Sequence, residues 1–97
     1  MNDFELSFPD IISMCQKEVL TASKKKFLLE GCRDKESFDE LSNELLEAYF
    51  AFGHFKADVR MKMKVIPQPV NAAFSDVERE YRSTISFYKD YKLLKGF

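Results

Sequence analysis

The chain has 97 residues, of which 45% are hydrophobic and 32% are charged, and it contains only three glycines and three prolines. This length fits one domain, and this composition excludes a disordered tail, a collagen-like repeat and a loop-rich sandwich. Fifteen basic against sixteen acidic side chains give a net charge of −1, so the chain as a whole has no electrostatic attraction for nucleic acid or an anionic membrane.

The sequence shows no signal for export, membrane insertion or metal binding. The first residues lack the basic and then apolar regions of a secretory signal, and no apolar run approaches the roughly 20 residues that cross a bilayer. Cys15 and Cys32 form no Cys-x-x-Cys motif and have only His54 as a further soft ligand, too few for a structural zinc site. We therefore expect a cytoplasmic protein with two free thiols, no metal, no cofactor and no membrane contact.

Residues 1–7 are expected to form an arm or a short extra turn, and the first helix is predicted over residues 9–30. The segment Ser-Phe-Pro-Asp at 7–10 is a typical start, because proline pre-sets the helical φ and aspartate favours the positive end of the helix dipole. Gly31 should end the helix in the left-handed conformation. The predicted inward-facing residues are Phe8, Ile12, Cys15, Val19, Ala22 and Leu29, interrupted by Lys26.

The longest predicted helix covers residues 37–66, and the rest of the chain should pack along it. One row of apolar residues recurs every seven positions and a second row fills the alternate position, the pattern of a helix that buries one stripe against its neighbours. Ser37 and Glu40 form a capping box, with Asp34 as the alternative N-cap, and Pro67 should end the helix at Ile66. The first row is Phe38, Leu45, Phe52, Val59 and Ile66, and the second is Leu41, Ala48 and Phe55, ended by Lys62.

A competing pattern runs through residues 59–65, where Val-Arg-Met-Lys-Met-Lys-Val alternates as a half-buried strand does. Gly53 could then end a shorter helix. We favour the continuous helix, because the seven-residue row persists through Val59, and because a strand would need a partner that no second alternating stretch provides.

Residues 65–70 are the clearest break, since Pro69 should prevent a quick return to helix after Pro67. A second capping box, Ser75 with Glu78, begins a third helix predicted over residues 75–94 and closed by Gly96. The predicted fold is all-α, a single-domain antiparallel three-helix bundle with a long central helix, and the alternative is a four-helix bundle with a break near Gly53. The inward stripe of the third helix is Phe74, Val77, Tyr81, Thr84, Tyr88 and Tyr91, widened by Ile85 and Leu94.

Aromatic residues supply the candidate partner-binding set. Four of them fall within residues 49–55, and helical spacing spreads them around the axis, so they cannot all face one neighbouring helix. Tyrosine combines an apolar ring with a polar tip, which suits a partly wet boundary. Lys26 and Lys62 also interrupt the apolar rows, which indicates seams that one chain does not fully cover. The predicted partner-binding residues are Tyr49, Phe50, Phe55, Tyr81, Tyr88 and Tyr91.

Charged residues give two further candidate faces. Lys56, Arg60 and Lys64 share one helical face, with Lys62 nearby, and could line a phosphate backbone, although cations near a helix C-terminus also favour the helix dipole. Glu40, Glu44 and Glu47 form an acidic stripe suited to a basic partner. The lone His54 has Ala57 and Asp58 at the next positions along its face, so the sequence places no nucleophile–base pair there.

We expect a non-enzymatic protein-binding module that inhibits, neutralises or adapts a larger protein. A protein partner or self-association would cover the exposed seams. The alternative is a nucleic-acid-binding regulator that uses the basic face of Lys56, Arg60 and Lys64. Bacteriocin immunity proteins, small phage-encoded inhibitors, antitoxins and secretion chaperones share this size and helix content, but no motif aligns with any of them, and the expectation of a phage or mobile-element accessory protein rests on size alone.

Overall fold

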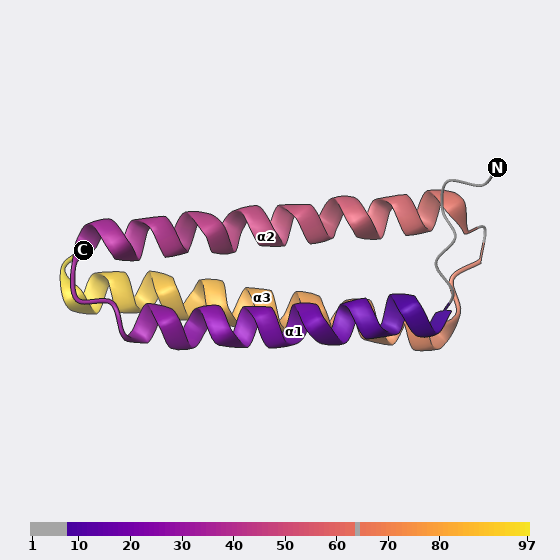
Figure 1. Cartoon of the computed structure of the whole chain (residues 1–97), viewed down its shortest axis with the longest axis horizontal. Coiled ribbons are helices and arrows are strands. Elements are labelled where there is room, and N and C mark those ends of the chain that lie inside the picture. The colour runs from indigo at the N-terminus through magenta and orange to yellow at the C-terminus, as the bar shows by residue number, and fades with distance from the viewer. Residues whose placement is uncertain (1–7, 64) are drawn as a thin grey trace.

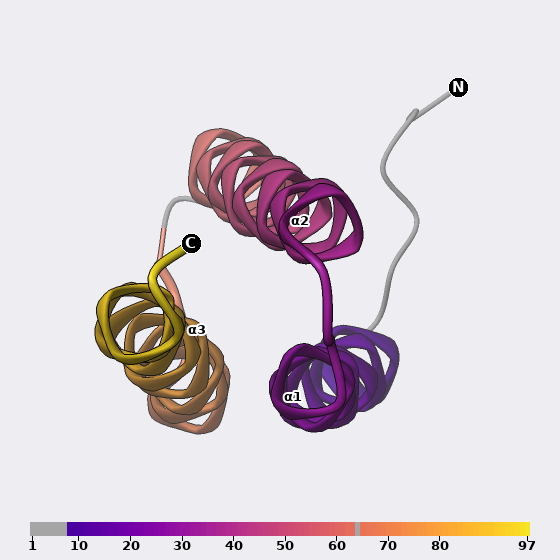
Figure 2. The ribbon, with the colours of Figure 1, turned by 90° about the vertical axis from the view of Figure 1, so that its left-hand side faces the viewer.

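The computed structural model describes residues 8–63 and 65–97, and within these ranges the chain forms three α-helices joined by short connections (Figure 1). Helix α1 spans Phe8–Glu30, α2 spans Lys35–Lys62 and α3 spans Gln68–Lys95. They form an elongated bundle of 50 × 24 × 16 Å, and in the end view they occupy the corners of a triangle (Figure 2). The predicted antiparallel three-helix bundle is confirmed. Predictions for residues 1–7 and for Lys64 lie outside the described residues.

Helices α1 and α3 run parallel and pack closely against each other. Several of the buried side chains on these two helices are small or short, and they allow the two backbones to approach. They include Cys15 and Ala22 on α1 and Val77 and Thr84 on α3. Four side-chain hydrogen bonds then tie the pair together along its length. They join Tyr81 to Glu18, Thr84 to the Ala22 carbonyl, Ser23 to Glu80, and Tyr91 to the Glu30 carbonyl.

Helix α2 is held to this pair mainly by aromatic rings. The Phe38 ring lies 5.8 Å from that of Tyr91 and 5.2 Å from that of Phe97, and the Phe52 ring lies 5.9 Å from that of Phe74. The predicted first row is confirmed for the helical part of its length, since Phe38, Leu45, Phe52 and Val59 are all buried. The second row, Leu41, Ala48 and Phe55, is only partly buried. One face of α2 is therefore sealed, and its opposite face is open.

The start of α2 differs from the preferred prediction. Asp34 is the N-cap: its side chain accepts a hydrogen bond from the Ser37 backbone N–H at 3.4 Å, and the helix begins at Lys35. Either residue satisfies the free amides of a first turn, and the earlier cap adds further helical residues. The capping box at Ser37 is wrong, and the alternative that names Asp34 is right.

The two prolines begin α3 and do not delay it. Pro67 is the N-cap, and its carbonyl accepts from the backbone N–H groups of Val70 and Asn71 at 3.0 and 3.1 Å. Pro69 lies in the first turn, where the N–H that it lacks would have had no helical acceptor. The predicted start at Ser75 is therefore seven residues late. Helix α2 ends at Lys62, with Met63 extended, because the Pro67 ring would clash with the Met63 carbonyl in a continued helix.

Other expectations are also corrected. Gly31 ends α1, but the only positive φ among the described glycines is that of Gly96, at 73°. On α1, the predicted inward residues Cys15, Ala22 and Leu29 are buried, and Ile12 and Val19 pack partly buried against the core. Phe8 was wrongly included, since it is 47% exposed, and the fully buried Ile11 was left out. Helix α2 passes through Gly53 without a break, which removes the four-helix alternative, and residues 59–62 are helical, with no strand anywhere in the described ranges.

Candidate functional site

A shallow, mostly apolar groove, here called the α2 groove, lies along α2 between its open side and α3. Its floor lies beside Gly53 and Ala57, two small residues one turn apart, where a side chain on Gly53 would meet nothing within 4 Å. The groove has a volume of about 650 Å³. It is lined by Tyr49, Phe50, Phe52, Gly53, His54, Lys56, Ala57, Arg60 and Glu78.

Two adjacent rings form one wall of the α2 groove. The Phe50 side chain is 64% exposed, and its ring lies 6.2 Å from the ring of Tyr49. Tyr49 is partly buried, with its ring 5.6 Å from that of Tyr81 on α3. Tyr49 therefore contacts both Phe50 and Tyr81, and Phe50 projects into solvent as a large apolar side chain on a helix.

Charged side chains border the other end of the α2 groove. Lys56 pairs with Glu78 of α3, and Glu78 also accepts from Arg82 at 3.3 Å. The pKa of Arg82 is raised, first by its side-chain hydrogen bond with Tyr49 and then by the nearby negative charge of Glu78. Arg60 is exposed one turn beyond Lys56. These contacts join α2 to α3 beside the groove and leave Arg60 as its exposed cation.

The predicted aromatic set is divided by the fold. Tyr49 and Phe50 lie together at the α2 groove. Tyr81 is fully buried, and its hydroxyl donates to Glu18 at 2.5 Å, so it offers no surface to a partner. The Tyr88 and Tyr91 rings pack on Phe38 at the other end of the bundle, and Phe55 packs on Phe52 and Phe74.

The predicted basic face is divided as well. Lys56 is partly buried in its pair with Glu78, whereas Arg60 and Lys62 are exposed. Lys64 lies outside the described residues. Of the acidic stripe, Glu40, Glu44 and Glu47 are all exposed on α2, and Glu44 lies 3.7 Å from Lys25 of α1.

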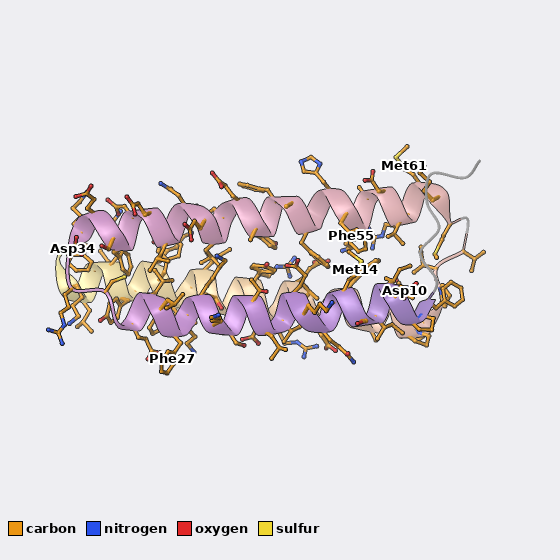
Figure 3. All side chains as sticks on the ribbon, viewed as in Figure 1. Asp10, Met14, Phe27, Asp34, Phe55 and Met61 are labelled. Atoms are coloured by element: carbon orange, nitrogen blue, oxygen red, sulfur yellow. The ribbon has the colours of Figure 1, made fainter. Side chains whose placement is uncertain are left out.

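Sequence reasoning missed an apolar pair on α1. Leu20 is 70% exposed and Phe27 is 76% exposed, and they lie seven residues apart on one side of the helix. Phe27 points outward from α1, on the side away from α2 (Figure 3). The signal was present in the sequence, because both residues lie outside the inward row at a spacing of two helical turns. Lys26, next to Phe27, places its ammonium 5.2 Å from the centre of the Phe87 ring.

Among the described residues no thiol lines the α2 groove, although five of its lining residues are titratable: Tyr49, His54, Lys56, Arg60 and Glu78. Cys15 and Cys32 are free thiols, as predicted, and both are buried away from the groove. Burial, followed by the charges of Glu18 and Asp76, raises the pKa of Cys15 to about 11, which keeps the thiol protonated at neutral pH. The groove contributes an exposed ring, a small-residue floor and a cation, a combination suited to holding another apolar side chain.

Comparison with family models, with curated proteins and with solved structures finds no match for this chain. Among the described residues, no three or more metal-ligating side chains gather in one place, and none of the described helices has the length and apolar character needed to span a bilayer.

Proposed function

We propose that this protein is a non-enzymatic protein-binding module whose α2 groove receives a helical segment of another polypeptide. The observation that carries the proposal is the exposed stripe on α2, opposite its sealed face. This stripe meets the α2 groove at Phe50, His54 and Ala57. Its members recur every three or four residues, at Asn43, Glu47, Phe50, His54, Ala57 and Met61.

A helix is the partner element that best fits this stripe. The stripe covers roughly 27 Å of helix at 1.5 Å per residue, and ridge-into-groove packing aligns a second helix along such a row. Phe50 is the expected anchor, because large aromatic side chains carry much of the binding energy at protein interfaces. The proposed role is to inhibit, neutralise or adapt a larger protein, which requires binding and no chemistry.

The nucleic-acid alternative has weaker support. It depends on a continuous cationic face, but Lys56 already pairs with Glu78, and Glu78 is shared with Arg82. Arg60 and Lys62 then provide two exposed charges among the described residues of that face, and few phosphate contacts give weak binding at physiological salt. A gel shift that Arg60→Glu abolished would favour this alternative.

Site-specific photocrosslinking tests the protein-binding proposal. A benzoylphenylalanine at position 50 should give discrete crosslinks to one segment of another protein. Mass spectrometry identifies that segment, and its sequence should show the apolar periodicity of a helix. The matched control places the same residue at Lys89, an exposed position on α3. Equal crosslinking from both positions, or crosslinking from neither, would contradict the proposal.

A further inference from the structure

The outer face of α1 combines exposed apolar side chains with positive charge. Within residues 13–28, every exposed side chain of α1 is apolar, uncharged or a lysine, and the large apolar ones include Leu20 and Phe27. The one acid of this stretch, Glu18, is partly buried and accepts a hydrogen bond from the hydroxyl of Tyr81. The face is therefore free of exposed carboxylates over these four turns, on a chain that has more acidic than basic residues overall.

The lysines and the large apolar side chains of this face form two rows with the same period. Lys17 and Lys24 are seven residues apart, as are Leu20 and Phe27, and each lysine precedes its apolar neighbour by three positions. Residues three apart are neighbours on a helix surface, so a row of positive charge runs beside a row of apolar groups. Coiled coils use such an arrangement, in which an apolar seam is flanked by charges that select the partner.

The other two lysines of α1 already have contacts within the bundle. Lys25 lies 3.7 Å from Glu44 of α2, and Lys26 places its ammonium over the Phe87 ring of α3. Both are partly buried, whereas Lys17 is exposed, as is Lys24. The exposed positive charge of the face therefore comes from the row beside Leu20 and Phe27.

The flank of the apolar row that faces α3 carries balanced charges. Asp76 pairs with Arg79 at 3.4 Å, and Glu80 accepts a hydrogen bond from Ser23 of α1 at 2.8 Å. Leu20 lies beside these residues. The excess charge lies on the lysine flank alone, so the face distinguishes a partner with acidic residues on one side of its apolar row from a partner without them.

We propose that this face of α1 docks a negatively charged amphipathic helix of another protein. The partner places apolar side chains at seven-residue spacing over Leu20 and Phe27, and a neighbouring row of aspartates or glutamates over Lys17 and Lys24. The inference goes beyond the α2 groove and does not depend on it, since Phe27 points outward from α1 on the side away from α2 (Figure 3). Two docking faces on different helices suit a protein that adapts one polypeptide to another.

An anionic bilayer is the other kind of surface that attracts lysines and apolar groups. A helix that lies in a bilayer surface buries a broad apolar face there and carries many cations opposite that face. The broad apolar face of α1 is already buried in the bundle, and its outer face has two exposed lysines, which attract anionic lipids weakly. A two-row stripe of this width fits a helix better than a bilayer.

Fluorescence anisotropy with designed peptides tests the charge preference. Three labelled helical peptides share one row of leucines at seven-residue spacing and differ in the neighbouring row, which is glutamate, glutamine or lysine. The full chain should bind the glutamate peptide on the order of tenfold more tightly than the lysine peptide, and added salt should reduce the difference. Equal binding of the three peptides, or no binding of the glutamate peptide, would overturn the proposal.

Charge reversal assigns the preference to its residues. The double variant Lys17→Glu with Lys24→Glu should reverse the order of the peptides. The matched control is Lys89→Glu with Lys92→Glu, an equal change in net charge at exposed positions on α3, and it should preserve the order. The same reversal in both double variants would overturn the proposal, because the preference would then follow net charge and not the α1 face.

Nuclear magnetic resonance shift mapping with the glutamate peptide locates the contact. The peptide should shift backbone signals along the outer face of α1, and Phe27→Ala should weaken its binding on the order of tenfold or more. Phe50→Ala, at an exposed ring on α2, is the matched control and should leave the affinity unchanged. Shifts centred on the α2 groove, equal losses from both variants, or tighter binding to vesicles of anionic phospholipid than to the peptide would overturn the proposal. None of these results would affect crosslinking of a partner from position 50, so the proposed function is tested separately.

Discussion

Two phenylalanines two residues apart on α2 should differ sharply in their contribution to stability. Phe52 is 4% exposed and packs its ring 5.9 Å from Phe74 and 6.4 Å from Tyr81, whereas Phe50 is 64% exposed. Phe52→Ala leaves a cavity between α2 and α3 and should lower the free energy of unfolding by about 3–5 kcal/mol. Phe50→Ala removes only about a third of a buried ring and should cost about 0.5–1 kcal/mol.

Urea unfolding followed by far-ultraviolet circular dichroism measures both values. The protein should be dilute, so that association does not add to the stability of wild type. Domains of this kind have about 5–15 kcal/mol in total, so Phe52→Leu, at about 1–2 kcal/mol, is measured beside Phe52→Ala as a variant that keeps enough folded protein for the assay. Equal losses at positions 50 and 52 would refute the assignment of a sealed face and an open face to α2.

Three further predictions concern the core and the helix ends. Tyr81→Phe removes the buried donor to Glu18 and should cost about 1–2 kcal/mol in urea unfolding, whereas an unchanged midpoint would mean that the hydroxyl contributes nothing. Because burial raises the Cys15 pKa from 9.0 to about 11, stability should be complete below pH 9 and fall as pH rises through 11, and Cys15→Ala should flatten that decline in unfolding curves. Gly96→Ala should cost about 1 kcal/mol in thermal unfolding because φ is 73° there, whereas Gly31→Ala, without a positive φ, should be neutral.

The sealed row of α2 was predictable because a seven-residue repeat of large apolar residues is typical of a helix that buries one stripe against its neighbours. The inward row of α1 was predictable at Cys15, Ala22 and Leu29, but the burial of Ile11 in place of Phe8 was not. Ile11 and Ile12 are adjacent, and Leu20, Phe27 and Leu28 place further apolar groups on other sides of the helix. The pattern alone therefore fits more than one inward face, and contact with α3 decides between them.

The role of the prolines also depended on context. Proline breaks a helix interior and begins a helix at its first turn, and the sequence around Pro67 and Pro69 is compatible with both outcomes. Tertiary packing decides, because the earlier start buries Val70 in the core.

The candidate site was predictable in part. Spacing showed that the four aromatics of residues 49–55 cannot all face one helix, and Tyr49 and Phe50 are the two at the groove. It considered Gly53 only as the break of the alternative four-helix bundle, whereas in the structure Gly53 lines the α2 groove. Tyr81 and Tyr49 look alike in the sequence, since both are tyrosines on amphipathic helices. Tyr81 is buried with its hydroxyl donating a hydrogen bond to Glu18, and the sequence does not reveal this contact because Glu18 lies 63 residues away along the chain.

The most direct test of the central claim is a photocrosslinking scan along α2, with benzoylphenylalanine placed in turn at positions 47, 50, 57 and 61, which are all exposed. The account predicts that these positions crosslink to one segment of another polypeptide, in the order expected for a helix that lies along α2. Crosslinks that are no more frequent from α2 than from position 89 on α3, or that scatter over unrelated segments, would contradict it.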